Sequence, residues 1–208
     1  MINIITGRPG SGKTYILVQK ALDFLKQGIP VFSNVLIKTE DKNFHYFQEF
    51  DELIKVRDGV IILDEAQVYL NSRKWDVLPS IVQYKLQQHR KHGLHIWGSV
   101  QHIARLDVIF RELVGRYYEV RKIGTGETKD GKLPKRVFGI FILVEYLPEE
   151  AKIKKRKWVS FRITRMRREI CLAYDTLKDI GFKEGQEGVI DVKMYVCPKC
   201  GARKILKG

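Results

Sequence analysis

The fold of this chain is decided by the stretch Gly7-Arg8-Pro9-Gly10-Ser11-Gly12-Lys13-Thr14, which has the spacing Gly-x-x-x-x-Gly-Lys-Thr. It follows an apolar run over residues 3–6, predicted to be a strand, and precedes an amphipathic pattern over residues 14–27, predicted to be a helix. A glycine-rich loop in this position exposes backbone N–H groups and a helix N-terminus, which together bind phosphate groups. The context predicts a phosphate loop rather than a glycine turn with an incidental lysine.

The predicted ligand of this loop is ATP with Mg²⁺. Lys13 would reach the β- and γ-phosphates, and the hydroxyl of Thr14 would ligate the metal. The residues expected to contact the nucleotide are consecutive: Gly7, Arg8, Pro9, Gly10, Ser11, Gly12, Lys13, Thr14 and Tyr15.

A second motif follows the apolar run over residues 59–63, where Asp64 and Glu65 stand side by side. A buried parallel strand would deliver both carboxylates to the carboxyl edge of the sheet, where open α/β sheets bind their ligands. Asp64 is expected to hold Mg²⁺ through water, and Glu65 to polarise the water that attacks the γ-phosphate. The pair indicates ATP hydrolysis coupled to movement, and a surface acidic pair that merely ends a strand is the weaker interpretation.

Another expected strand, residues 94–100, ends in polar residues. A polar side chain there would lie between the two motifs and could sense the γ-phosphate. Gln101 is the first candidate and Ser99 the second, whereas His102 is interpreted as a surface residue.

Strand and helix patterns alternate over residues 1–123. Further strands are expected at 30–37 and 117–123, and helices at 50–56, 78–92 and 105–114. This alternation predicts an α/β fold with a parallel sheet flanked by helices. Two later runs, 136–147 and 157–164, are expected to add an antiparallel β-hairpin to the sheet edge. We therefore predict a P-loop domain over residues 1–165 and a small tail over residues 166–208.

The chain has 208 residues and a formal net charge of +14, and much of that surplus lies in the segment 152–168. The basic residues of this segment, which contains no acidic one, are Lys152, Lys154, Lys155, Arg156, Lys157, Arg162, Arg165, Arg167 and Arg168. Trp158 and Phe161 interleave with these charges. The segment predicts binding to the phosphate backbone of DNA. The alternative is a solvated edge strand whose charges prevent aggregation.

Several stretches together carry a family resemblance. They are Asn34, Asp64-Glu65, residues 88–96 with His89-Arg90-Lys91-His92-Gly93, residues 109–114 before Tyr117-Tyr118, and Asp175-Thr176 after Tyr174. Together they resemble the N-terminal ATPase domain of the zonular occludens toxin (Zot) family, the filamentous-phage gene I type of assembly ATPase. The resemblance covers roughly residues 1–123 well and the later strands loosely.

The resemblance implies a place among the additional-strand, catalytic-glutamate P-loop ATPases, near the DNA-pumping motors. Those proteins act as rings in which an arginine of a neighbouring subunit completes each site. The implied arginine is Arg90, with Arg105 and Arg111 as alternatives. A homo-oligomer and viral or phage assembly proteins are the implied partners. Family members commonly continue into a transmembrane helix, and this sequence has no apolar stretch of about 20 residues to form one.

Cys197 and Cys200 form a single Cys-x-x-Cys motif, and Gly201 follows it. This motif has the form of half a zinc knuckle. Zinc takes four ligands, so a second pair would have to come from another subunit or from elsewhere. Bound Zn²⁺ and an unmetallated tail stay open as alternatives. Three cysteines and the absence of a signal peptide argue against a secreted disulfide scaffold and favour the cytoplasm of a host cell.

Two other classes of function share some of these motifs. Type II thymidine kinases pair a phosphate loop with Asp-Glu-x-Gln, which here is Asp64-Glu65-Ala66-Gln67, but a second Cys-x-x-Cys is missing. A protein that tethers or loads DNA in an ATP-dependent manner, without translocating it, is the other alternative. The leading hypothesis is a ring-forming motor for viral or phage DNA assembly, packaging or translocation.

Overall fold

The computed structural model describes residues 1–70, 80–124, 138–147, 158–174, 193–196 and 203–206. The chain divides into two compact units, residues 1–178 and 179–208. Helix α4 (Arg168–Leu172) follows the boundary predicted at residue 165 and belongs to the first unit. In the second unit, β9 (Lys193–Val196) and β10 (Arg203–Leu206) pair antiparallel.

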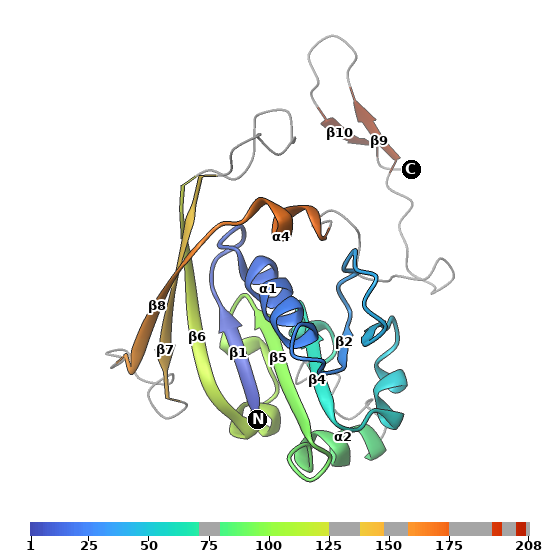
Figure 1. Ribbon diagram of the computed structural model, residues 1–208. Helices are drawn as coiled ribbons and strands as arrows, with labels where there is room; N and C mark the ends of the chain where they lie inside the picture. The colour runs from blue at the N-terminus through green and yellow to red at the C-terminus, as the bar shows by residue number, and fades with distance from the viewer. Residues whose placement is uncertain (71–79, 125–137, 148–157, 175–192, 197–202, 207–208) are drawn as a thin grey trace. The chain divides into compact units, whose positions relative to one another are not determined.

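The first unit is built on an eight-stranded sheet with the order β3-β2-β4-β5-β1-β6-β7-β8 (Figure 1). The strands are β1 (Ile2–Thr6), β2 (Val31–Ser33), β3 (Phe44–Tyr46), β4 (Gly59–Leu63), β5 (Leu94–Val100), β6 (Val114–Ile123), β7 (Ile140–Tyr146) and β8 (Ser160–Arg165). Strands β1 to β6 are mutually parallel, and β7 and β8 extend the sheet in an antiparallel manner. The predicted α/β fold with a hairpin at the sheet edge is confirmed.

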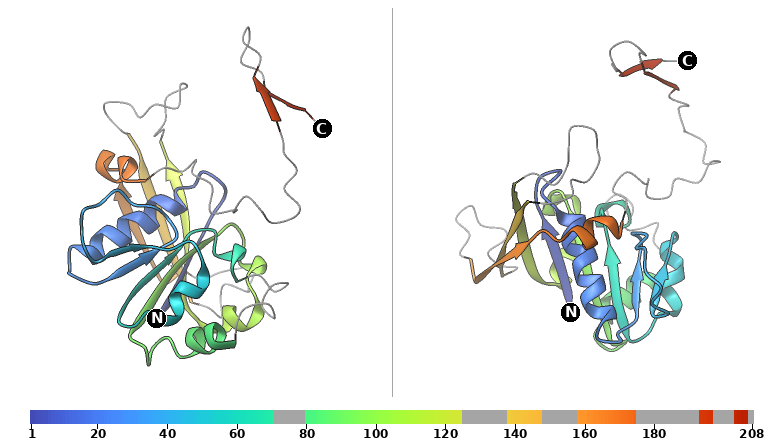
Figure 2. Two further views of the ribbon diagram at one scale, coloured as in Figure 1. Left: turned by 90° about the vertical axis from the view of Figure 1, so that its right-hand side faces the viewer. Right: turned by 45° about the horizontal axis from the view of Figure 1, so that its top comes forward.

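Helices cover both faces of the sheet, as Figure 2 shows. On one face, α1 (Lys13–Leu25) and α4 share a core in which Leu17, Phe141 and Ile170 are buried. On the other face, α2 (Ser80–Gln87), α3 (Val108–Leu113) and the 3-10 turn η1 (Phe50–Lys55) bury Leu86, Phe110 and others. Successive strand residues point to opposite faces of the sheet. A continuous apolar run such as β4 therefore contributes side chains to both cores.

The structure differs from the predicted elements mainly at their ends. The strand expected over residues 30–37 stops at Ser33, and the side chain of Asn34 bonds to the backbone of Asp64 at the end of β4. The helix expected over residues 105–114 is split into η4 (Ile103–Arg105) and α3, since Asp107 accepts the Ile109 N–H at 2.7 Å as an N-cap. The pattern analysis missed β3 and α4, which have three and five residues.

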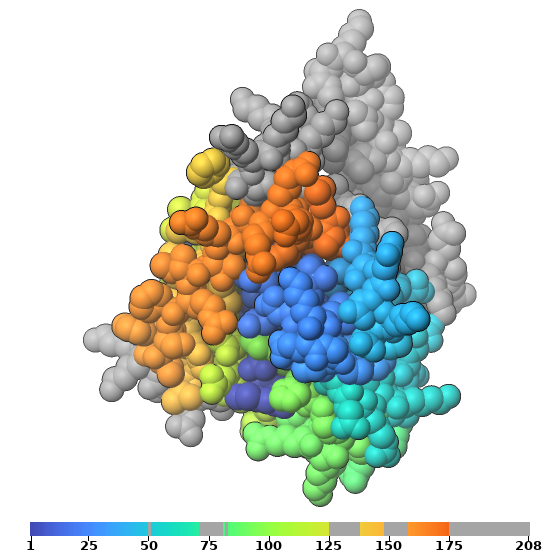
Figure 3. Space-filling view, viewed as in Figure 1, coloured from blue at the N-terminus to red at the C-terminus, as the bar shows by residue number. Residues whose placement is uncertain are grey.

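Residues 166–174, which we call the strap, contain α4 and run from the end of β8 to the segment that follows β2. After α4, the N–H of Lys38 donates to the carbonyl of Ala173 at 2.7 Å, and Ile37 and Tyr174 form an antiparallel bridge. Figure 3 shows this segment, in orange, lying against α1, in blue. The antiparallel extension is thereby tied to the segment that follows β2.

Candidate nucleotide-binding site

The phosphate loop links β1 to α1 and depends on glycine at two positions. Gly10 and Gly12 have φ values of 74° and 92°, which side-chain-bearing residues rarely adopt. Gly12 also lies against Phe141 of β7, and a Cβ there would stand 2.1 Å from the ring Cε1. The loop is therefore shaped by its own backbone and by the antiparallel extension behind it.

Lys13 lies across this loop. Its side chain is buried, and Nζ donates to the carbonyl oxygens of Gly7 at 3.1 Å and Arg8 at 3.3 Å. A buried ammonium group that is held only by carbonyl dipoles has no neutralising anion in these contacts. A phosphate in the loop would supply that anion.

The two motifs meet where Thr14 contacts Asp64. Thr14 Oγ1 donates to Asp64 Oδ2 at 2.6 Å, although 50 residues separate them in the chain. A hydroxyl and a carboxylate side by side fit Mg²⁺, which takes few protein ligands and keeps several waters. Within the described ranges, no group of three or more His, Cys, Asp and Glu side chains is placed to hold a metal. Thr14 and Asp64 are the residues that could hold Mg²⁺ at this edge of the sheet.

Asp64 is held by its neighbour strand as well as by the loop. Its N–H donates to Asn34 Oδ1 at 2.7 Å, and its carbonyl accepts from Asn34 Nδ2 at 2.9 Å. Burial raises the pKa of the Asp64 carboxyl, and hydrogen bonds from Ser99 and Thr14 oppose that rise. A cation beside the carboxylate would stabilise its charged form.

Glu65 adopts an unusual backbone conformation. Its φ is 49°, in the left-handed region that a glutamate seldom occupies, and such outliers cluster at functional sites. Its N–H donates to Ser99 Oγ at 3.1 Å, and the same hydroxyl donates to Asp64 Oδ1. Gln67 Nε2 donates to Glu65 Oε2. Ser99, the second candidate at the end of β5, therefore joins the two acidic residues, and Gln67 is a site neighbour that the sequence analysis did not assign.

Gln101 and Arg105 contact each other just beyond β5. Gln101 Oε1 accepts from Arg105 Nη1 at 2.9 Å. Because β5 is parallel to β1 and Val100 is paired with Thr6, Gln101 lies at the same edge of the sheet as the phosphate loop. Its role as a γ-phosphate sensor stays a prediction.

Arg90 lies at the opposite edge of the sheet. It precedes β5 by four residues, and β5 runs parallel to β1, so Arg90 is at the amino ends of the strands. It is exposed, and its charge helps to lower the pKa of the Met1 amino group, after the larger effect of burial. As an arginine finger, Arg90 would serve a neighbouring subunit. Arg111, one of the alternatives, has a buried Nε without a hydrogen-bond partner in the described part of the chain.

Tyr15 points into the core rather than toward the loop. Its side chain is 2% exposed and stacks on Phe141 with ring centroids 4.4 Å apart. The hydroxyl accepts the Arg167 N–H at 2.8 Å and donates to the Arg165 carbonyl at 3.4 Å. Only the backbone of Tyr15 would then contribute to nucleotide binding.

The basic segment is described in part. Lys152, Lys154, Lys155, Arg156 and Lys157 lie outside the described residues, as do Cys197 and Cys200. Arg162, Arg165, Arg167 and Arg168 are exposed. Trp158 and Phe161, also exposed, form an edge-to-face pair 5.9 Å apart. In the ranges that the structure covers, no helix is both long and apolar enough for a membrane span.

These features agree with a comparison to protein families, in which the model named zonular occludens toxin (Zot) matches residues 1–133. The chain belongs to the Zot family. The predicted family is confirmed by this match. No curated protein matches the sequence.

Solved structures show the same fold for this Zot-family chain. It is similar to the N-terminal domain of zonular occludens toxin from Neisseria meningitidis, with a TM-score of 0.56, 20% identity, and coverage of 84% of this chain and 98% of that one. It is also similar to the genome packaging NTPase B204 from Sulfolobus turreted icosahedral virus 2 in complex with ATP-gammaS, with a TM-score of 0.51, 14% identity, and coverage of 78% and 95%. The fold is that of a P-loop NTPase.

Proposed function

We propose that this Zot-family protein hydrolyses ATP with Mg²⁺ and uses the energy to move viral or phage DNA during assembly or packaging. The observation that carries the proposal is the contact of Thr14 with Asp64 at 2.6 Å, with Glu65 next in the chain. It brings a metal-binding hydroxyl, a carboxylate and a water-activating glutamate to one edge of the sheet.

In the proposed reaction each residue has a separate task. Lys13 leaves the loop carbonyls to neutralise the β- and γ-phosphates, and the loop N–H groups bind their oxygens. Thr14 and Asp64 would hold Mg²⁺, which when bound would draw charge from the γ-phosphate. Glu65 accepts a proton from the water whose oxygen bonds to the γ-phosphorus as the bond from that phosphorus to ADP breaks. Ser99 positions Glu65, because its hydroxyl oxygen accepts the backbone N–H of Glu65. Gln101 would sense the γ-phosphate from the end of β5.

Features of the surface support the two other parts of the proposal, a DNA partner and a ring of subunits. The net charge of +14 and the exposed arginines near Trp158 and Phe161 favour a nucleic acid partner. Arg90 is exposed and remote from the loop of its own chain, as a finger that acts between the subunits of a ring would be. The relative B204 is a genome packaging NTPase by name, which agrees with this role. We expect the protein to act in the host cytoplasm with other assembly proteins.

The test is the rate of ATP hydrolysis with and without DNA, for the unaltered protein, Glu65→Gln and the control Glu112→Gln on the exposed side of α3. Loss of a general base costs about 10²–10⁴-fold, so Glu65→Gln should lose hydrolysis yet still bind ATP. Glu112→Gln should match the unaltered protein. Phosphorylation of thymidine would favour a thymidine kinase. Binding of ATP and DNA without ATP hydrolysis would favour a protein that tethers or loads DNA without translocating it. Rates that rise steeply with protein concentration would support a site completed between subunits.

A further inference from the structure

A cavity of about 850 Å³ adjoins the phosphate loop on the side away from Asp64. One wall is the loop, residues 7–11, and the other is the end of β6, with Glu119, Arg121, Lys122 and Gly124 among the lining residues. Strands β4 and β5, which lead to the acidic pair and to Ser99, lie on one side of β1, and β6 lies on the other. The cavity thus lies on the other side of β1 from Asp64, Glu65 and Ser99.

The cavity has the size of a small-molecule site, which commonly occupies about 300–1,000 Å³. Lys13, Thr14 and Asp64, the expected partners of the phosphates, do not line it. A nucleotide whose phosphates are in the loop must direct its ribose and base to one side of that loop. The space beside β6 begins where the loop begins, so the ribose and base fit there.

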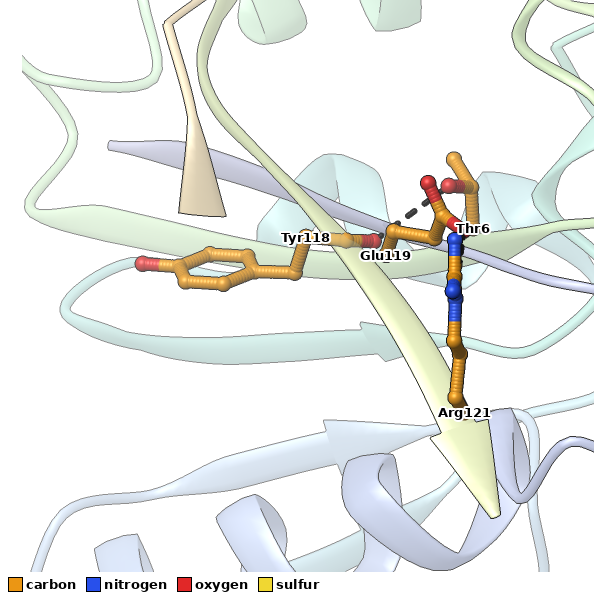
Figure 4. Close-up of polar contacts among 4 residues, drawn as sticks. All are labelled: Thr6, Tyr118, Glu119 and Arg121. Atoms are coloured by element: carbon orange, nitrogen blue, oxygen red, sulfur yellow. Dashed lines mark hydrogen bonds and ion pairs between the residues drawn. The ribbon is translucent and has the colours of Figure 1, made fainter. Parts of the chain in front are cut away.

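Two charged side chains face this space from one side of β6. Glu119 is paired with Thr6, the last residue of β1, and Arg121 follows two residues farther along. Residues two apart in a strand lie on the same face. Arg121 donates to Glu119 Oε1 from Nε at 3.1 Å and from Nη2 at 2.9 Å, and Figure 4 shows the two side chains meeting beside Thr6.

The wall between loop and strand is close-packed and polar. Thr6 Oγ1 donates to the Tyr118 carbonyl at 3.4 Å, and a Cβ at Gly7 would stand 2.8 Å from the Val120 carbonyl oxygen. Ser11, which also lines the cavity, has a buried Oγ with no hydrogen-bond partner among the residues that the structure covers. Such an unsatisfied hydroxyl is costly unless a ligand or water completes it.

We propose that Glu119 and Arg121 bind the nucleoside part of ATP, a role that rests on the proposed function. Glu119 lies at the level where the loop starts, so its carboxylate accepts a hydrogen bond from a ribose hydroxyl. Arg121 lies farther from the phosphates, and its guanidinium, with the side chain 70% exposed, offers a planar face to the purine ring. The order along β6 from Glu119 to Arg121 matches the order of ribose and base in the nucleotide.

The experiment compares ATP with inorganic tripolyphosphate, which has the phosphates but no nucleoside. Calorimetry in Mg²⁺ would measure both affinities for the unaltered protein, Glu119→Gln and Arg121→Ala. Each variant should bind ATP about tenfold more weakly, which corresponds to 1.4 kcal/mol, and should bind tripolyphosphate as before. The matched control is Arg116→Ala, which removes a second β6 ion pair, with Glu145 at 2.7 Å, outside the cavity lining.

Tripolyphosphate binding also reports that the variants are folded. Equal losses of ATP and tripolyphosphate, or unchanged ATP affinity in both variants, would overturn the role of Glu119 and Arg121. Equal affinity of the unaltered protein for the two ligands would overturn it as well, while leaving phosphate binding intact. Failure of the unaltered protein to bind either ligand would instead refute the proposed ATPase.

Discussion

Removing a single hydroxyl, by Tyr15→Phe, tests how the phosphate loop is tied to the antiparallel extension. Tyr15 follows Thr14 directly, and its hydroxyl reaches the turn between β8 and α4. Burial raises the pKa of this hydroxyl, so it stays protonated and serves as donor and acceptor at neutral pH. Phenylalanine keeps the ring and its stacking on Phe141, and loses only the hydrogen bonds.

The magnitude follows from the two bonds. The 2.8 Å bond from the Arg167 N–H is the stronger, and the 3.4 Å bond to Arg165 is long. A typical protein hydrogen bond contributes about 0.5–1.5 kcal/mol net, and a buried donor left unsatisfied costs about 1–3 kcal/mol. Because Arg167 is an exposed residue, water partly replaces the lost partner. We expect a loss of about 1–2 kcal/mol, or about 2–8 °C in Tm for a unit of this size.

Urea unfolding followed by circular dichroism would measure the loss, with Tyr84→Phe as the control, since Tyr84 is 55% exposed on α2. The control should lie within about 0.5 kcal/mol of the unaltered protein. A Tyr15→Phe variant as stable as the control would refute the reasoning, because the hydroxyl would then contribute nothing to holding the strap. A loss well above about 3 kcal/mol would mean that the ring packing also changed.

Three further predictions concern the site. Gly12→Ala places a Cβ against the ring of Phe141 at a residue with positive φ. It should lower the free energy of unfolding by at least about 2 kcal/mol, measured by thermal melting, and weaken ATP binding, measured by calorimetry. Asn34→Ala leaves the buried N–H and carbonyl of Asp64 unpaired and should lower the free energy of unfolding in urea by about 2 kcal/mol or more. Since burial raises the pKa of Asp64, the folded protein keeps that proton to higher pH than the unfolded chain does, and the contribution of Asp64 to stability falls as pH rises above about 3.8. Urea unfolding at several pH values should therefore show Asp64→Asn gaining stability relative to the unaltered, nucleotide-free protein as pH rises.

Residues 88–96, one of the stretches that carry the family resemblance, have a structural role rather than a chemical one. His89 is buried, and its Nδ1 lies 2.9 Å from the Leu86 carbonyl oxygen. Gly93 has a φ of 64°, and a Cβ there would stand 2.0 Å from Asp58 Oδ1. These residues shape the turn that leads from α2 into β5. Arg90 projects from that turn, so a packing motif also sets the position of the candidate finger.

Local patterns in the sequence determined the phosphate loop, the acidic pair and the parallel sheet. Each of these depends on residues close together in the chain, such as an apolar run followed by glycines or by Asp64-Glu65. The pattern of apolar and polar residues also predicted the antiparallel hairpin at the edge of the sheet. It predicted the first and last residues of helices and strands less accurately. The position of the boundary between the two units and the short β3 and α4 depend on packing that leaves little trace in a short window.

The tertiary structure alone decided which polar groups meet. Ser99 rather than Gln101 touches both acidic residues, because the Ser99 hydroxyl faces the end of β4 across the sheet. The cavity beside the loop is lined by residues 7–11 and by residues 119–122 and 124, more than a hundred positions apart, because β6 pairs with β1. Strand order arises from long-range pairing and burial of two cores, and no local pattern in the sequence contains that information.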